Sequence, residues 1–331
     1  MKQYLNGLFL IRKPSGITSH DVVAKLRRIL SIKQVGHTGT LDPLAEGLMG
    51  VLVGEATKVS NFLRDESKSY RLELQLGLTT DTEDITGEVL ENKDAGRITE
   101  EVLKSQILDL EGEMTIPVPK YSAIKRDGQK LYEKARAGVE FEPPLKLMGF
   151  SNIKIENVDL PKAQVSFNCT KGSYVRSWIT ELGRHLEVGA TMTALERTRI
   201  FNYHLEEAIQ LEDLESLKEG FHELKQAYLN QPESFYTQKM DLVKKLGLSF
   251  YELSQLFPHW KSIMIQGRDE KLLKNGMVSH ELNRRLIFEQ KKAQKTGEIQ
   301  DIKVLSSSSG QLLSILEARP DSPLKIKRVF N

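Results

Sequence analysis

The sequence predicts an α+β protein of about two domains, with a larger sheet-and-helix part followed by a small β-rich part. Three observations predict this class. Residues 70–76 alternate strictly between apolar and polar side chains, which is typical of a half-buried strand. Residues 19–30 carry apolar side chains at helical spacing. From about residue 258 onward, short strand-like runs separated by turns dominate the 331-residue chain.

The first 50 residues predict a strand, a helix and an unusual loop. The opening strand ends at Pro14–Gly16, and Thr18 or Ser19 is placed to cap the helix that follows. The glycine-rich stretch 34–47 predicts a shaped loop that runs into a short helix.

The later elements follow the same periodicities. Helices are expected at 100–110, 129–138 and 175–186, and a charged helical region at 205–250. Strands are expected at 150–158, 163–170, 262–267, 301–307, 312–318 and 326–330. The spacing of the last four, with turns near 307–310 and 319–322, suggests a small β-barrel-like domain.

Composition excludes several classes of protein. Hydrophobic residues make up 39% and charged residues 28%, which suits a globular chain with a real core. No run reaches the roughly 18 apolar residues of a membrane-spanning helix, and the N-terminus has no secretory cleavage pattern. A single cysteine, Cys169, excludes an internal disulfide, a four-cysteine zinc site and a CxxC pair, and is expected in the core. We therefore expect a cytoplasmic protein that does not act at a membrane.

The net charge of +2 hides strongly basic stretches. Residues 120–136 carry six basic side chains against two acidic ones. Aromatic residues lie within or near the basic clusters, and this combination indicates a polyanionic partner, because cations meet phosphates and rings stack on bases. Further basic positions are Lys25, Arg27, Arg28, Lys33, Lys171, Arg176, Arg184, Arg197 and Arg199.

The densest polar constellation is GHTGTLDPLAEG, residues 36–47. Glycines on both sides of Asp42 allow a close approach of backbone to a ligand, and Pro43 stiffens the chain beside the carboxylate. From the residues alone, Asp42 is either an aimed carboxylate or the N-cap of a helix, and His37 is either a catalyst or a loop-packing side chain. His37 lacks a second His or Cys at ligand spacing, so no metal site is expected.

With this motif the chain resembles the pseudouridine synthases of the tRNA pseudouridine synthase B type. The resemblance continues in order through GEATK, SKSY, DTEDITGEV, PVPKYSAIKRDGQKLYEKAR, CTKGSYVRSWITELG and GATMTALERTRI, and covers most of residues 5–205. It implies a mixed, mostly antiparallel sheet with flanking helices in a catalytic domain, residues 1–255. Within that domain, 115–138 is implied to be an RNA-binding insertion and 205–255 a helical connector. Residues 256–331 resemble the RNA-binding PUA domain.

The resemblance also implies a reaction. A uridine at position 55 in the T-loop of tRNA is flipped out and isomerised to pseudouridine, with no cofactor and no metal. Asp42 matches the nucleophile that holds a covalent intermediate. Arg176 matches the arginine that pairs with that carboxylate and keeps it ionised. Tyr70 matches the tyrosine that stacks on the base and helps to remove the C5 proton.

Further residues match substrate contacts. Tyr174 and Leu195 match walls of the uracil pocket, His37 the residue that fills the space of the flipped nucleotide, and Lys58 a phosphate contact. The insertion supplies expected backbone contacts: Lys120, Lys125, Arg126, Lys130 and Arg136. The implied partner is the T-arm of tRNA, with the acceptor stem meeting the C-terminal domain, and the chain is expected to act as a monomer.

Departures from the family pattern and two other functions stay open at this point. Lys146 stands near the place of a usual arginine, and Glu46 adds a carboxylate close to Asp42. A non-catalytic RNA-binding or tRNA-folding protein on the same scaffold would need the basic clusters but not Asp42, Tyr70 and Arg176. A pseudouridine synthase that acts on another RNA would carry the same motifs.

Overall fold

One large sheet joins strands from most of the first 255 residues. The computed structural model describes residues 4–63, 67–126 and 128–330. The strands of this sheet are β1 (Gly7–Lys13), β2 (Val35–His37), β3 (Glu46–Val53), β4 (Lys68–Leu76), β7 (Gly112–Pro117), β10 (Leu145–Asp159), β11 (Lys162–Cys169), β12 (Ala190–Ile200), β13 (Tyr203–His204), β14 (Ile209–Gln210) and β15 (Phe250–Glu252). Their main path is β14-β1-β3-β12-β4-β11-β10-β7. Only β1–β14 and β3–β12 pair in parallel among the described strands of this sheet, so the predicted mixed, mostly antiparallel sheet is confirmed.

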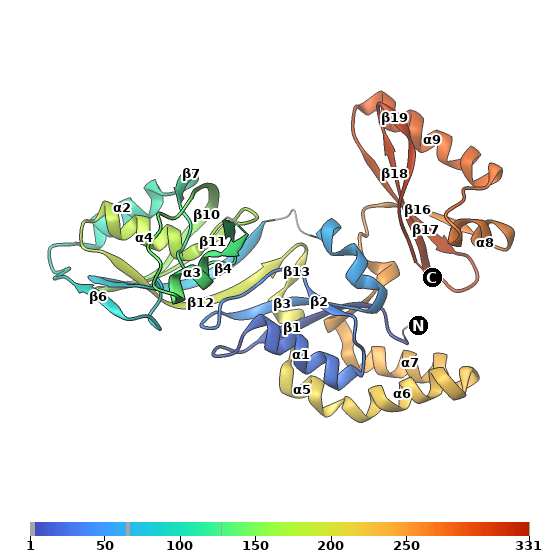
Figure 1. Cartoon of the computed structure of the whole chain (residues 1–331), viewed down its shortest axis with the longest axis horizontal. Helices are drawn as coiled ribbons and strands as arrows, with labels where there is room; N and C mark the ends of the chain where they lie inside the picture. The colour runs from blue at the N-terminus through green and yellow to red at the C-terminus, as the bar shows by residue number, and fades with distance from the viewer. Residues whose placement is uncertain (1–3, 64–66, 127, 331) are drawn as a thin grey trace.

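Helices flank this sheet in two groups (Figure 1). The helices are α1 (Ser19–Leu30), α2 (Glu100–Asp109), α3 (Leu131–Arg136), α4 (Val175–His185), α5 (Leu211–Ser216), α6 (Lys218–Asn230) and α7 (Pro232–Leu246). The 3₁₀ helices are η1 (Gly54–Leu63), η2 (Leu205–Glu207), η3 (Gly247–Ser249) and η4 (Leu253–Gln255). Helices α1, α5, α6 and α7 gather near β1, whereas α2 and α4 cover the other end of the sheet. Two small hairpins, β5 (Leu78–Thr80) with β6 (Val89–Asn92) and β8 (Lys125–Arg126) with β9 (Gln129–Lys130), complete this part.

The local signals at α1 and β4 act as predicted. The Thr18 side chain accepts a hydrogen bond from the Asp21 backbone N–H, and the Asp21 carboxylate accepts one from Thr18, which forms a capping box. In β4, Tyr70 and Leu72 are buried while Arg71 between them is exposed. This alternation places Tyr70 on the face of the sheet that carries the core.

The short helix predicted after the glycine-rich loop is wrong, and so is Asp42 as its N-cap. The loop runs directly into β3, whose residues Gly47–Val53 are buried. A short, continuous apolar run suits a strand covered on both faces. Pairing of β3 with β1 and β12 therefore overrides the local Asp-Pro signal. The helix predicted at 129–138 is also shorter, because 129–130 belong to β9.

The C-terminal part forms an open sheet rather than the predicted barrel-like arrangement. The strands β16 (Lys261–Ile265), β17 (Gln300–Ser306), β18 (Leu312–Arg319) and β19 (Ser322–Val329) pair in this order. Two helices that the sequence analysis missed, α8 (Arg268–Lys274) and α9 (His280–Thr296), lie between β16 and β17 along the chain. Leu282, Leu286 and Ala293 of α9 are buried against this sheet and give it a core of its own.

A second apolar cluster joins the two sheets. Leu8 and Leu10 of β1 belong to the same buried cluster as Leu312, Ile315 and Phe330 near the C-terminal end. The C-terminal sheet therefore packs against the large sheet through apolar side chains. Among the helices that the structure describes, none is long and apolar enough to span a membrane.

Candidate active site

The β2–β3 loop presents Asp42 and is held by hydrogen bonds on both sides of it. Before Asp42, the Leu41 backbone N–H donates to Ser19 Oγ at 2.8 Å, and Ser19 Oγ donates to Leu41 O at 3.0 Å. After it, Nζ of the buried Lys13 donates to Pro43 O at 3.2 Å and to Ala45 O at 2.6 Å. The carboxylate is thus fixed from two neighbouring elements, α1 and β1.

Arg176 forms the ion pair with Asp42 that the sequence predicts. Its Nη2 lies 2.9 Å from Asp42 Oδ2, and its side chain is 5% exposed against 35% for Asp42. Nη1 donates to Thr82 O at 2.9 Å and Nη2 to Tyr121 O at 3.2 Å. Because these two carbonyls fix the plane of the guanidinium, the cation is aimed at one carboxylate oxygen.

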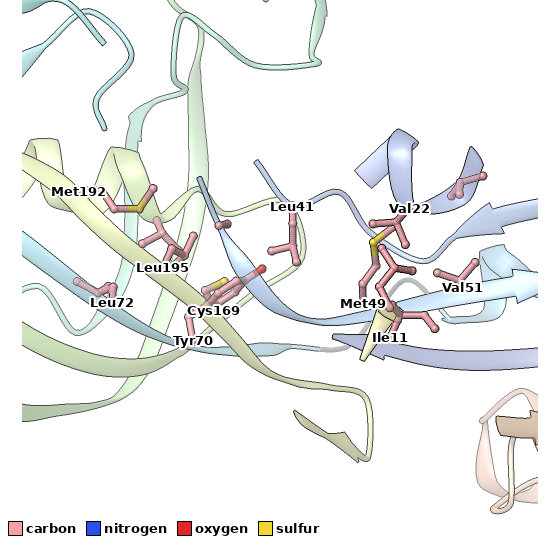
Figure 2. Close-up of a cluster of buried hydrophobic side chains, with 14 of the residues drawn as sticks. Ile11, Val22, Leu41, Met49, Val51, Tyr70, Leu72, Cys169, Met192 and Leu195 are labelled. Atoms are coloured by element: carbon pink, nitrogen blue, oxygen red, sulfur yellow. The ribbon is translucent and has the colours of Figure 1, made fainter. Parts of the chain in front are cut away.

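A pocket of about 190 Å³ surrounds this pair. Tyr70 and Leu195 form part of its wall, and Figure 2 shows both beside Leu72 and Cys169 in the buried cluster beneath the site. The pocket is lined by Thr40, Leu41, Asp42, Tyr70, Tyr121, Ser122, Ala123, Ser173, Tyr174, Val175, Arg176 and Leu195. Five of the residues selected from sequence therefore meet in one cavity. Its walls combine one ion pair with aromatic and aliphatic side chains, which suits a flat, uncharged ring.

Burial favours the neutral form of two of the three phenols that line this pocket, those of Tyr70 and Tyr174. Burial raises the pKa of Tyr70 to about 12, while the charge of Arg197 opposes the rise. Burial, and then the charge of Asp42, raise the pKa of Tyr174. Both side chains therefore enter the pocket as O–H groups at neutral pH.

Glu83 places a second carboxyl group near the ion pair. Burial raises the pKa of Glu83 to about 7, and the charge of Arg176 is the largest influence in the opposite direction. Its Oε2 is buried and accepts no hydrogen bond within the part of the chain that the structure describes. Its backbone has φ of +64°, an uncommon conformation for a residue with a side chain. The sequence analysis did not select it.

Other predicted contacts lie outside this pocket. His37 ends β2, and Lys58 pairs with Glu55 on η1, so neither lines the cavity. Lys146 Nζ lies 5.8 Å from the Tyr174 ring centroid and donates to Gly172 O at 2.8 Å, at the edge of the site. Glu46 is exposed at the start of β3 and does not line the pocket.

The basic insertion forms a hairpin and a short helix beside the pocket, with residue 127 outside the described residues. The predicted cations Lys120, Lys125, Arg126 and Arg136 are exposed, and Lys130 is half-buried. Lys130 Nζ lies 5.3 Å and Arg136 Cζ 5.5 Å from the Tyr132 ring centroid. The insertion thus presents cations around an aromatic ring.

Arg197 and Lys13 are site residues that sequence analysis did not identify as such. Arg197 was counted among the cations for a polyanion, but its side chain is buried. Two residues apart on β12, Leu195 and Arg197 share one face of the strand, and this period-two relation is the signal for its burial. Within the described residues, no group of three or more His, Cys, Asp and Glu side chains is arranged to hold a metal ion.

Known proteins similar to this chain are pseudouridine synthases, the family that its sequence motifs resemble. Residues 27–175 match the family described as TruB family pseudouridylate synthase (N terminal domain). The chain is 42% identical, over 99% of its length and 98% of the other protein, to tRNA pseudouridine synthase B of Bdellovibrio bacteriovorus. It is 44% identical to the protein of that name from Clostridium tetani over 63% of this chain and 73% of that protein. A chain of a Cbf5–Nop10–Gar1 complex has the same fold, with a TM-score of 0.63 and 19% identity over 99% of this chain and 85% of that one.

Proposed function

Because the chain belongs to the TruB family and isomerises uridine to pseudouridine in tRNA, we propose that its target is uridine 55 of the T-loop and its nucleophile is Asp42. The observation that carries the assignment of Asp42 is its ion pair with the buried Arg176 at 2.9 Å inside a pocket with aromatic and aliphatic walls. An ionised carboxylate that is fixed, paired and next to a site for a flat ring has what covalent catalysis needs.

The proposed steps balance without a cofactor. A carboxylate oxygen of Asp42 bonds to C1′ as the N1–C1′ bond breaks, and the uracil keeps the bonding electron pair at N1. The base turns within the pocket between Tyr70 and Leu195, which line it. C5 then bonds to C1′ and displaces Asp42, the C5 proton leaves, and N1 gains a proton.

Base access requires that the uridine leave the folded loop, which costs a few kcal/mol. The exposed cations of the insertion, with the ring of Tyr132 among them, are proposed to hold the RNA backbone during this step. We also assign His37 to the space of the flipped nucleotide and Lys58 to a phosphate. Both are expected to affect tRNA affinity more than the chemical step, because they lie outside the pocket.

Loss of the C5 hydrogen provides the assay. A tRNA transcript with [5-³H]uridine releases tritium to water when C5 bonds to C1′, and sequencing of the modified site then reports its position. We expect release equal to one uridine per tRNA at position 55. Release from another position, or from other RNAs at a higher rate, would favour the alternative substrate, and no release with folded protein would favour a non-catalytic RNA-binding role.

Asp42→Asn tests the nucleophile in the same assay. The substitution keeps the shape of the side chain but removes the ionised oxygen, so turnover should vanish while tRNA affinity stays within about tenfold, since many phosphate and stacking contacts support binding. Affinity is measured by filter binding. Turnover above a few per cent of wild type would contradict Asp42 as nucleophile.

We divide the chain into a catalytic domain, 1–255, and an RNA-binding domain, 256–331, and propose that it acts as a cytoplasmic monomer. The helix α9 supports RNA contact by the second domain. It presents exposed Lys291 and Lys292, and beside them Phe288, 71% exposed, at the rim of a pocket of about 380 Å³. We assign the acceptor stem to this surface, because it lies outside the domain that holds the target pocket.

A further inference from the structure

Arg197 is a buried cation that no carboxylate neutralises within the described part of the chain. Its side chain, on β12, is 1% exposed, and every ion pair found among the described residues involves other groups. Burying an unpaired cation is costly unless hydrogen bonds compensate. The presence of an arginine at this buried position therefore indicates that its hydrogen bonds have a role, which an apolar side chain could not fill.

Those hydrogen bonds hold both ends of the loop that carries Asp42. Arg197 Nη2 donates to Gly39 O and Nη1 to Thr40 O, each at 3.2 Å. On the far side of the loop, Nε donates to Leu48 O at 2.7 Å. One guanidinium thus links Gly39 and Thr40, just before Asp42, to Leu48, six residues after it.

The backbone at this position is equally close to the loop. Arg197 pairs with Gly47 of β3 in parallel and with Tyr70 of β4 in antiparallel orientation, so it lies between the strand that follows the Asp42 loop and the strand that carries Tyr70. Gly47 has φ of +97°, and a Cβ there would lie 2.5 Å from Arg197 O. Only glycine permits this approach, which brings β12 against the end of the loop.

Arg197 also lies beside Tyr70, its partner across β12 and β4, and its charge opposes the rise that burial causes in the pKa of the phenol. A guanidinium has donors and no acceptor, so Arg197 cannot accept a hydrogen bond from the phenol. The phenol proton is then not used by Arg197, and Tyr70 faces the pocket as a hydrogen-bond donor. A phenolate formed by loss of that proton would also be stabilised by the adjacent cation.

We propose that Arg197 is a positioning residue of the isomerase: it holds the Asp42 loop and Tyr70 in one frame and leaves the Tyr70 hydroxyl proton available to the uridine. This inference rests on the proposed function, in which Asp42 and Tyr70 meet the substrate. Arg197 itself touches no substrate, because it lies beneath the pocket and does not line it. It acts through Tyr70 and the loop.

The test compares Arg197→Lys and Arg197→Met with Arg199→Met as matched control. Arg199 follows on the same strand and also makes three hydrogen bonds, to Ser69 Oγ at 2.9 Å, Phe201 O at 3.0 Å and Ser67 Oγ at 3.3 Å, but none to the loop. Single-turnover tritium release and tRNA affinity are measured for each. We expect a loss of at least 100-fold in single-turnover rate for Arg197→Met, about tenfold or more for Arg197→Lys, and less than threefold for the control, with the tRNA affinities of both Arg197 variants within threefold of wild type.

A cycle with Tyr70→Phe separates positioning from general stability and does not depend on the folding of Arg197→Met. If Arg197 acts partly through the phenol, Arg197→Lys should cost at least fivefold less in the Tyr70→Phe background than in wild type. Additive losses, or a wild-type rate for Arg197→Lys, would overturn the inference. Failure of the proposed function has a different signature, since wild-type protein would then release no tritium.

Discussion

Replacement of Arg176 by lysine keeps a cation beside Asp42 but removes the planar fork, and this isolates the value of geometry. Arg176 serves three acceptors: Asp42 Oδ2 at 2.9 Å, Thr82 O at 2.9 Å and Tyr121 O at 3.2 Å. A lysine ammonium on a flexible stem reaches the carboxylate but cannot meet both carbonyls in their present directions. Each hydrogen bond from a charged donor contributes roughly 1.5–3 kcal/mol.

Loss of the two carbonyl contacts, partly offset by the new ammonium, should lower the free energy of unfolding by about 3 kcal/mol. For a domain of this size that corresponds to a fall in Tm of about 6–12 °C. Turnover should fall by about 100-fold, because a misplaced cation no longer fixes the Asp42 oxygen for attack. The ion pair with Asp42 contributes less to the free energy of unfolding than the carbonyl contacts do, since Asp42 is 35% exposed and its charge is partly screened by water.

Thermal denaturation and tritium release measure the two effects on the same preparations. Arg184→Ala is the control on the same helix: Arg184 is 66% exposed and forms a surface ion pair with Glu181, so its loss should change Tm by less than about 2 °C and leave turnover unchanged. An Arg176→Lys protein with the Tm and turnover of wild type would refute the argument that the fork, and not only the charge, is required.

Three further predictions follow from the site and from the surface of the second domain. Tyr70→Phe should keep base stacking but lose the hydroxyl, so single-turnover release should fall by more than tenfold while tRNA affinity changes by less than threefold; equal losses in both would indicate packing alone. Glu83→Gln should raise stability at pH 8 but not at pH 4.5. The folded protein holds the Glu83 proton up to about pH 7, whereas the unfolded chain loses it near its ordinary pKa of 4.5. The free energy of unfolding of wild type therefore falls between pH 4.5 and pH 7, by about 3 kcal/mol in all, and the variant avoids this loss. Equal differences in Tm between variant and wild type at both pH values would contradict this. Charge reversal of Lys291 and Lys292 to Glu should weaken tRNA binding by more than threefold and flatten its salt dependence, with turnover at saturating tRNA retained, whereas an unchanged salt slope would exclude α9 as an RNA contact.

The elements near the site were predictable where local signals and long-range pairing agree. The capping box at Thr18 and the alternation in β4 both specify what the structure contains. The motif around Asp42 pointed to the carboxylate that pairs with Arg176, whereas its alternative interpretation as a helix cap was wrong. The decisive interaction there is the insertion of β3 between β1 and β12, and a window of a few residues does not contain it.

Burial of charged side chains was the harder part of the site. Arginines in a basic sequence are expected at the surface, and this expectation holds for Arg184 but fails for Arg176 and Arg197. For Arg197, the period of the strand and the neighbouring Leu195 carry the information, whereas its acceptors are backbone carbonyls of the Asp42 loop and of β3, more than 140 residues away. Backbone acceptors leave no trace in the type of residue that supplies them, so the partners of Arg197 could not be read from the sequence.

The same limit applies to the C-terminal domain and decides how its role has to be tested. Because all predicted chemistry lies between His37 and Leu195, the sequence suggests that the cleft folds without residues from about 258 onward. The structure places Leu312, Ile315 and Phe330 in one buried cluster with Leu8 and Leu10 of β1. Deletion would uncover this apolar face on the strand that also carries Lys13, the lysine that holds the loop after Asp42. A loss of activity on deletion would therefore report damage to the Asp42 loop as readily as loss of an RNA contact. Substitutions on the exposed face of α9 leave the cluster intact, and they are the perturbation that separates the two roles of this domain.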